Sequence, residues 1–329
     1  GLRVNADGEL VVGTAAGDIV DQAPVAFQEV DGRRVDVAAR YAPGAPAADG
    51  SRPYGFELGT YDPTATLVID PAMVVYASLI GTAEADRGLG IELDDERNAY
   101  LCGEYGREAF VAKFDPTGTE LLYLAVIGGD GSDHAFDIDV DPQGSAYITG
   151  ATSSATDFPV KGGPDLTYGG GTADALIVKL APDGQDIAYA GFIGGAGNDF
   201  GEAIVVDEDG NAYTSGDAES TERTFPVVVG PDLTQNGQVD AYVVKVKADP
   251  TAEDPRDNFA WAGFVGGAGY DVAVGDYGMS AGHLAIDKDR NVYISDQTNS
   301  DERSFPDGDG MGDLPGPDRR ALAVEQRTA

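Results

Sequence analysis

The sequence predicts an all-β protein, a β-propeller of at least four four-stranded blades that is preceded by a segment rich in β-hairpins. Three observations lead to this prediction. One order of strand-like blocks recurs four times along the chain. The blocks are short runs of branched, aromatic and alternating residues, separated by turns rich in Gly and Asp. No segment shows the apolar spacing of an amphipathic helix, and repeats of this kind are typical of propeller blades.

The N-terminal segment, residues 1–74, is expected to pack on the propeller or to complete it. Residues 2–14 and 23–42 have the pattern of hairpins, and the second turns at an Asp-Gly pair, the strongest short hairpin signal. A loop rich in Pro, Ala and Gly follows, and residues 54–70 resume the strand pattern. We expect no flexible linker between this segment and the repeats.

The propeller region, residues 75–329, is built from one recurring pattern. Each repeat has a block of the type Tyr-x-x-x-Ile-Gly-Gly, then a hairpin of the type Val-Asp-x-x-Gly-Asn-Ala-Tyr, then a strand of the type Asp-Ala-x-Val-x-Lys. Three blocks that keep their order make chance similarity an insufficient explanation. Because the hairpin has two arms, each repeat supplies four strands. The predicted repeats are 75–121, 122–187, 188–258 and 259–329.

These blocks resemble the bacterial repeat known as SBBP, a seven-bladed β-propeller type. The third repeat shows the resemblance best, in Ile193–Asp199, Val206–Tyr213, Phe225-Pro226 and Asp240–Lys245. The segment before the repeats is similar to the β-rich region that commonly precedes them. The resemblance implies a large secreted or cell-surface bacterial protein without a general catalytic motif. Four repeats are too few for a seven-bladed ring, so we expect a small ring, an incomplete one, or closure by another chain.

Composition excludes several functions. The chain of 329 residues has 21 Lys and Arg against 57 Asp and Glu, which gives a net charge of −36. Nucleic-acid binding and docking on anionic membranes are therefore not expected. One cysteine and two histidines cannot build a disulfide or a Cys-rich zinc site. No apolar run reaches the length of a membrane span, and no signal peptide is visible, so we expect a processed chain or a fragment.

Two series of aspartates recur with the repeats, and each has two interpretations. The carboxylates could line one mouth of the propeller for a cation, or they could cap the Gly-rich turns beside them. Turn capping is favoured because every repeat has the residue. The loop series is Asp86, Asp133, Asp199 and Asp271, and the hairpin series is Asp94, Asp141, Asp207 and Asp287.

Two further groups are candidate sites. Asp307, Asp309 and Asp313 stand in a Gly-rich loop at a spacing that lets three carboxylates converge on calcium, although a solvated loop explains them equally well. Phe-Pro pairs recur in the long insertions, and their rings could form an exposed rim for a protein or glycan, or could plug gaps between blades. These rings are Phe158, Phe225 and Phe305.

No catalytic motif stands out. His134 follows Ser132 and Asp133 directly, but adjacency in sequence is not the geometry of a catalytic triad. The first hypothesis is therefore a non-enzymatic, extracellular or cell-surface structural and protein-interaction module, with calcium as a candidate stabilising ion. A carbohydrate-active enzyme that uses a carboxylate pair is one alternative. A subunit or fragment of a larger extracellular filament or envelope assembly is the other.

Overall fold

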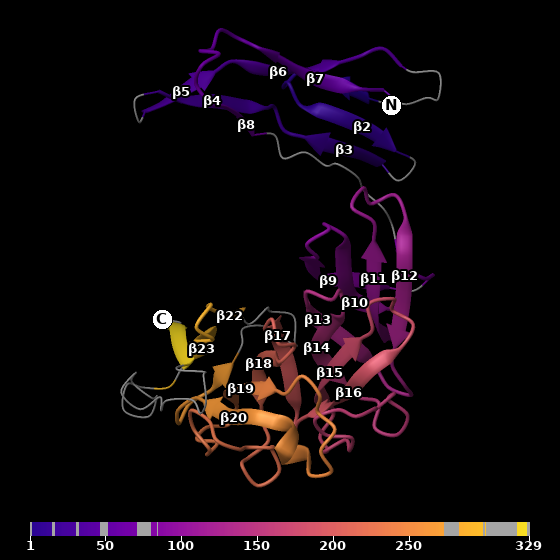
Figure 1. The fold of residues 1–329 in the computed structure, drawn as a ribbon, viewed down its shortest axis with the longest axis vertical. Helices are drawn as coiled ribbons and strands as arrows, with labels where there is room; N and C mark the ends of the chain where they lie inside the picture. The colour runs from indigo at the N-terminus through magenta and orange to yellow at the C-terminus, as the bar shows by residue number, and fades with distance from the viewer. Residues whose placement is uncertain are drawn as a thin grey trace. The chain divides into compact units, whose positions relative to one another are not determined.

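The structure is a computed structural model that describes residues 2–14, 17–30, 33–46, 52–70, 80–83, 85–272, 283–298, 300 and 321–327. The chain divides into two compact units, Gly1–Ala77 and Ser78–Ala329 (Figure 1). The described residues form an all-β protein, as the sequence predicts, and the helical element among them is one 3-10 turn, Pro255–Asn258.

The first unit holds three small antiparallel sheets, ordered β1-β2-β3, β5-β4-β8 and β6-β7. Both predicted hairpins are present. Leu2 pairs with Val12 in the first, and Val30 pairs with Arg33 in the second, on either side of the predicted Asp-Gly turn. The strands are β1 (Leu2–Val4), β2 (Leu10–Thr14), β3 (Gly17–Asp21), β4 (Val25–Val30), β5 (Arg33–Val37), β6 (Ala39–Pro43), β7 (Tyr54–Leu58) and β8 (Leu67–Asp70).

Polar and aromatic contacts hold this unit together. The Tyr41 hydroxyl donates to Asp21 at 2.6 Å, and its ring lies 5.5 Å from the Phe56 ring. The buried Gln28 side chain donates to the Asp62 carbonyl and accepts from the Asp62 backbone N–H, both at 2.7 Å. A buried amide that makes both bonds fixes the loop before β8 against β4.

The second unit contains four sheets in series. Three are complete four-stranded antiparallel meanders, and the fourth joins β21, β23 and β22, with β24 parallel to β23. The strands of the first two sheets are β9 (Asp86–Leu93), β10 (Ala99–Tyr105), β11 (Glu108–Phe114), β12 (Leu121–Ile127), β13 (Asp133–Val140), β14 (Ala146–Thr152), β15 (Asp174–Leu180) and β16 (Ile187–Ile193). The others are β17 (Asp199–Val206), β18 (Ala212–Ala218), β19 (Asp240–Val246), β20 (Phe259–Val265), β21 (Asp271–Val272), β22 (His283–Ile286), β23 (Val292–Thr298) and β24 (Ala321–Arg327).

The sheets begin one strand later than the predicted repeats. The Tyr-x-x-x-Ile block was placed at the start of each repeat, but in the structure it is the last strand of the preceding sheet, as β12, β16 and β20 show. After this strand a Gly-rich loop and its Asp lead the chain into the next sheet. A cyclic pattern read along a chain has no marker for its first strand, so only the hydrogen-bonded pairing settles the boundary.

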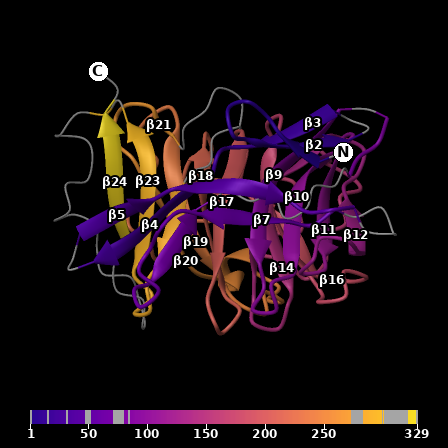
Figure 2. The same ribbon diagram turned by 90° about the horizontal axis from the view of Figure 1, so that it is seen from above.

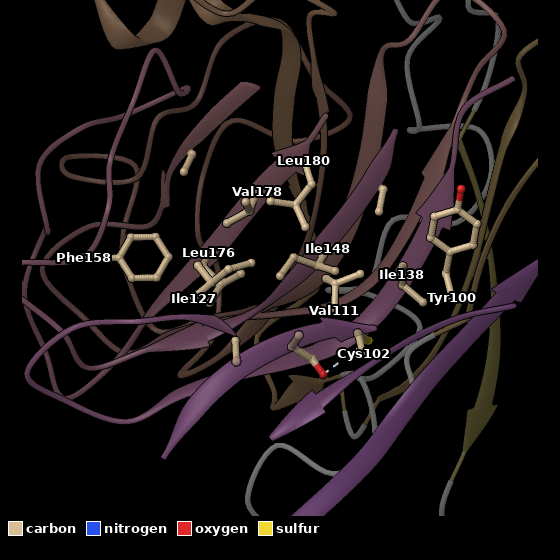
Figure 3. Close-up of a cluster of buried hydrophobic side chains, with 14 of the residues drawn as sticks. Tyr100, Cys102, Val111, Ile127, Ile138, Ile148, Phe158, Leu176, Val178 and Leu180 are labelled. Atoms are coloured by element: carbon tan, nitrogen blue, oxygen red, sulfur yellow. Dashed lines mark hydrogen bonds between the residues drawn. The ribbon is translucent and has the colours of Figure 1, made fainter. Parts of the chain in front are cut away.

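The core lies in layers between consecutive sheets. Alternate residues of a strand point to opposite faces, so each inner sheet contributes to two layers. In the second sheet Ile148, Leu176 and Val178 pack towards the first sheet (Figure 3). Their neighbours Tyr147 and Ile177 pack with the third sheet. Each such buried side chain contributes roughly 1.5–3 kcal/mol of hydrophobic stabilisation, so the layers join the sheets into one unit.

The first strands of consecutive sheets lie next to one another. β9 contacts β13, and β13 contacts β17. In the fourth sheet β21 and β22 both pair with β23, and β17 contacts β22. Figure 2 shows the same series from a second direction, from β12 at one end to β24 at the other. The N-terminal residues of β9, β13 and β17 therefore lie close together, and the candidate site is found there.

Candidate functional site

The loop aspartates cap the turns beside them. Asp133 is fully buried and accepts from the Gly129 N–H at 3.0 Å and from the Ser154 hydroxyl at 2.9 Å. Asp199 and Asp271 make the equivalent bonds, to the N–H of Gly195 and Gly267 and to the hydroxyls of Ser220 and Ser300. A carboxylate whose oxygens are taken up by three or four donors is held in the loop. The turn-capping interpretation describes this series.

The hairpin aspartates cap turns and also tie the sheets together. Asp141 accepts from the Ser145 N–H at 2.9 Å and from the Tyr147 hydroxyl at 3.0 Å, and its Oδ2 lies 3.4 Å from Nζ of Lys179. The same hydroxyl lies 3.3 Å from the carbonyl oxygen of Gly210 in the next sheet. The first and third sheets repeat this Asp–Tyr–Lys cluster with Asp94, Tyr100, Lys113 and with Asp207, Tyr213, Lys245.

A third set of carboxylates was not predicted as a group. The acid that begins the third strand of each complete sheet lies beside the loop Asp of the following sheet. A Cβ added to Gly194 would lie about 3 Å from the carboxyl groups of both Asp174 and Asp199. Burial, and then the charge of Asp199, raises the pKa of Asp174 to about 7. The other pairs are Glu108 with Asp133 and Asp240 with Asp271.

The predicted calcium loop, Asp307, Asp309 and Asp313, lies outside the described residues. Within the part of the chain that the structure describes, no group of three or more His, Cys, Asp or Glu side chains could hold a metal ion. Calcium binding therefore stays a prediction that depends on the sequence pattern.

The sequence offered three phenylalanine rings as an exposed rim, and two of these rings are buried in the structure. Phe158 is 5% exposed and packs 5.5 Å from the Phe192 ring, and Phe225 is fully buried at 5.1 Å from the Tyr242 and Phe264 rings. The interpretation as plugs in the core describes both residues, because the insertion folds its aromatic side chain back into the layer between sheets. Phe305 lies outside the described residues.

A cavity of about 260 Å³ lies where β9, β13 and β17 begin, which are the first strands of the first three sheets. Its wall includes the residue that follows the loop Asp in each of these strands. In the printed sequence these three equivalent positions hold different side chains, whereas the preceding Asp recurs. The wall residues used below are Arg87, Glu104, His134, Phe136 and Phe200.

Two backbone features place these wall residues. Phe136 is the extra residue of a β-bulge, since Ala135 pairs with Gly150 and Asp137 with Thr149. A bulge re-aims a side chain that would otherwise alternate with its neighbours. Across from it, a side chain at Gly150 would overlap the carbonyl oxygen of His134, so this glycine lets the two strands approach closely. The first and third sheets have bulges at the same position.

Polar and charged groups of the wall lie close to one another. Oε1 of Glu104 lies 2.9 Å from Nδ1 of His134 and 3.3 Å from Nη1 of Arg87. The His134 ring stacks 5.9 Å from the Phe136 ring, with 18° between their planes. The guanidinium of Arg107, beside the cavity, donates to the Ser132 hydroxyl at 3.3 Å. The cavity therefore combines a fixed donor, a fixed acceptor and apolar ring surface.

The triplet Ser132-Asp133-His134 does not form a catalytic triad. Asp133 points into its capped loop, and the carboxylate beside His134 comes from Glu104 on β10. Glu104, Arg87, Phe136 and Phe200 were not candidates in the sequence analysis. The signal that could have found them is their variation at positions where the surrounding repeat pattern is constant.

A comparison with known protein families matches the first unit. A family model described as a domain of unknown function (DUF7948) matches residues 1–72. No curated protein sequence matches the chain. Among the described residues, no helix has the length and apolar character that a membrane crossing requires.

Proposed function

We propose that this chain is a β-propeller-type module of a secreted or cell-surface bacterial protein, with a structural and protein-interaction role. One observation carries the proposal. The second unit repeats a four-stranded antiparallel sheet, the first strands of consecutive sheets are neighbours, and the recurring polar residues bond to turns and to adjacent sheets. Residues engaged in this way support a scaffold, and its remaining surfaces are free to bind a partner.

The first sheet supplies a surface for a partner chain. β9 has a neighbour strand on one side, and its side chains Leu89, Ile91 and Leu93 are 37%, 66% and 54% exposed. An exposed apolar edge strand is a template for pairing with another chain. This feature favours the membership of the chain in a larger assembly, which the incomplete repeat number also favours.

The mass of the native particle tests this role. The chain has a mass of 34.0 kDa. We expect light scattering, in the salt solution in which the native particle is extracted, to give a clearly larger mass. Ile91→Lys is expected to lower that mass without lowering the melting temperature, because the side chain is exposed. Val229→Lys is the matched control, since Val229 is 53% exposed and lies in the segment between β18 and β19 of the third sheet. A particle of 34 kDa for the unchanged chain contradicts the assembly role.

A carbohydrate-active enzyme is the alternative function, and the cavity is where it would act. Glycoside hydrolysis uses two carboxyl groups placed on either side of the scissile bond, and the cavity wall provides Glu104. A turnover screen on polysaccharides separates the two functions. Product release that Glu104→Gln abolishes would replace the scaffold role by the enzymatic one.

Calcium stabilisation is proposed for the loop that contains Asp307, Asp309 and Asp313. We expect calcium to raise the melting temperature, because an ion that binds only the folded chain stabilises it. The measurement is a thermal melt with and without a chelator at constant ionic strength, repeated on Asp309→Asn. An unchanged melt after chelation removes calcium from the proposal.

A further inference from the structure

The sheets of the second unit offer an internal test of what each position is for. Positions that hold the same residue in every sheet, such as the loop Asp and the hairpin Tyr, make the bonds that build the sheets. The position after the loop Asp holds Arg87, His134 and Phe200, three unrelated side chains that line one cavity. The fold does not require any of these side chains at this position, so a shared ligand is the feature that would select them together.

From this juxtaposition we propose that the cavity binds one pyranose unit of a neutral glycan. The proposal goes beyond the structural and protein-interaction role, and it concerns a different surface from the β9 edge. Phe136 and Phe200, from neighbouring first strands, supply aromatic surface for the C–H face of a sugar ring. Hydroxyl groups of the ring need donors and acceptors close together, which Arg87 and Glu104 provide.

The cavity is already arranged for such a ligand. The Glu104 carboxylate lies between Arg87 and His134, and its side chain is 12% exposed. Arg87, Glu104, His134, Phe136 and Phe200 all lie on strands, so these side chains lose little backbone freedom on binding, whereas Thr172 and Ala173 come from the segment between β14 and β15. The volume of about 260 Å³ is just below that of sites for drug-sized ligands, roughly 300–1,000 Å³, and suits a single sugar unit.

Charge selects a neutral ligand. The chain carries a net charge of −36, which disfavours the approach of an anion, and the guanidinium of Arg87 faces the carboxylate of Glu104. An anionic sugar would place its charge next to that carboxylate, and a cationic ligand would face the guanidinium of Arg87. A hydroxyl-rich, uncharged ring can accept from the guanidinium and donate to the carboxylate at the same time.

The test is calorimetric titration of the whole chain with three neutral probes, maltohexaose, mannohexaose and chitohexaose, and with hexagalacturonate as an anionic comparison. We expect saturable binding of at least one neutral probe and at least tenfold weaker binding of hexagalacturonate. Phe200→Ala removes ring surface, and Glu104→Gln keeps the shape while changing the acceptor. Each is expected to weaken the neutral probe at least tenfold, whereas Leu166→Ala, an exposed residue outside the cavity, leaves binding unchanged.

Four outcomes overturn the proposal. They are no saturable binding of any neutral probe, binding that neither variant weakens, equal or stronger binding of hexagalacturonate, and equal weakening by Leu166→Ala. Because Phe200 is partly buried, the melting temperature of each variant is measured first, and Glu104→Gln carries the test if Phe200→Ala melts early. The particle mass is a separate measurement, so failure here leaves the scaffold role standing, and failure there leaves the sugar site standing.

Discussion

Asp133 and His134 are neighbours on one strand but differ in role, because Asp133 caps a turn and His134 lines the cavity. Asp133 is fully buried, recurs in each sheet and is taken up by donors from the adjacent loop. His134 points to the cavity, differs from its counterparts Arg87 and Phe200, and lies against Glu104. The comparison separates a repeated framework from a variable cavity wall within a single strand. It teaches that in this chain the identity of a residue across the sheets, and not its chemistry alone, indicates its role.

The largest expected effect comes from breaking the framework at Asp133. Oδ2 of Asp133 accepts from the Gly129 N–H and the Ser154 hydroxyl, and Oδ1 accepts from the Thr152 hydroxyl. Asp133→Asn replaces one of these oxygens by an N–H₂ group, so at least one buried donor loses its acceptor. We expect the free energy of unfolding to fall by about 2–3 kcal/mol, measured by denaturant titration. His134→Ala is the matched control at the cavity wall, with an expected loss within about 1 kcal/mol. Equal losses in the two variants would erase the distinction between framework and wall.

The second effect concerns the Asp–Tyr–Lys cluster of the second sheet. Lys179 lies 3.4 Å from the buried Asp141 carboxylate and 4.6 Å above the Tyr147 ring. Lys179→Met leaves that carboxylate without its cation, and we expect a loss of about 2 kcal/mol in unfolding free energy. Arg40→Met breaks the exposed pair with Glu57 in the first unit and is expected to cost at most about 0.5 kcal/mol. A loss as small as that of Arg40→Met would show that the cluster does not stabilise the sheets.

The third effect is a pH dependence at the paired carboxylates. Burial, and then the charges of Asp199 and Asp165, raise the pKa of Asp174 to about 7 in the folded chain, against the ordinary 3.8. Between these pH values the folded chain holds a proton that the unfolded chain lacks. The contribution to stability is therefore present at low pH and is lost as the pH rises through about 7.

Asp174→Asn, which stays uncharged, tests this sign. We compare the free energy of unfolding of the variant with that of the unchanged chain at each pH. The difference, variant minus unchanged chain, is expected to be larger at pH 8 than at pH 5 by at least about 1 kcal/mol. Denaturant titrations of both chains at the two pH values give this difference directly. A difference that is the same at pH 5 and pH 8 would mean that Asp174 does not titrate in this range.

The smallest effect concerns one turn position across the hairpins. Gly144 and Gly210 hold it with positive φ, and Arg97 and Arg290 hold it with φ of 65° and 62°. A residue with a Cβ is strained there, so Arg97→Gly is expected to stabilise the chain by about 0.5 kcal/mol. Arg290→Gly relieves the same strain but loses the ion pair with Asp209, so a net loss is expected. Melting curves of both variants check the opposite signs.

The sequence predicted the strands and turns of the repeats, although not which strand begins each sheet, because strands and turns depend on local chemistry. Hairpins at Asp-x-x-Gly turns, alternating strands and turn-capping aspartates follow from residues a few positions apart. The burial of Phe158 and Phe225 and the pairing of Asp174 with Asp199 could not be settled in this way. Those outcomes depend on which sheet packs against the residue in question. The distance between strands of two sheets cannot be derived from a single sequence.

By itself, then, the sequence determined the all-β class, the order of strands, the positions of the turns and the acidity that disfavours anionic partners. The tertiary structure alone decided that the Tyr-x-x-x-Ile strand closes the preceding sheet and that Glu104 lies beside His134. It also decided that three unrelated side chains at one repeat position share a cavity. The physical reason is the sequence separation of the residues that interact. Turns and strand patterns are set by neighbours along the chain, whereas a cavity wall is set by packing between sheets.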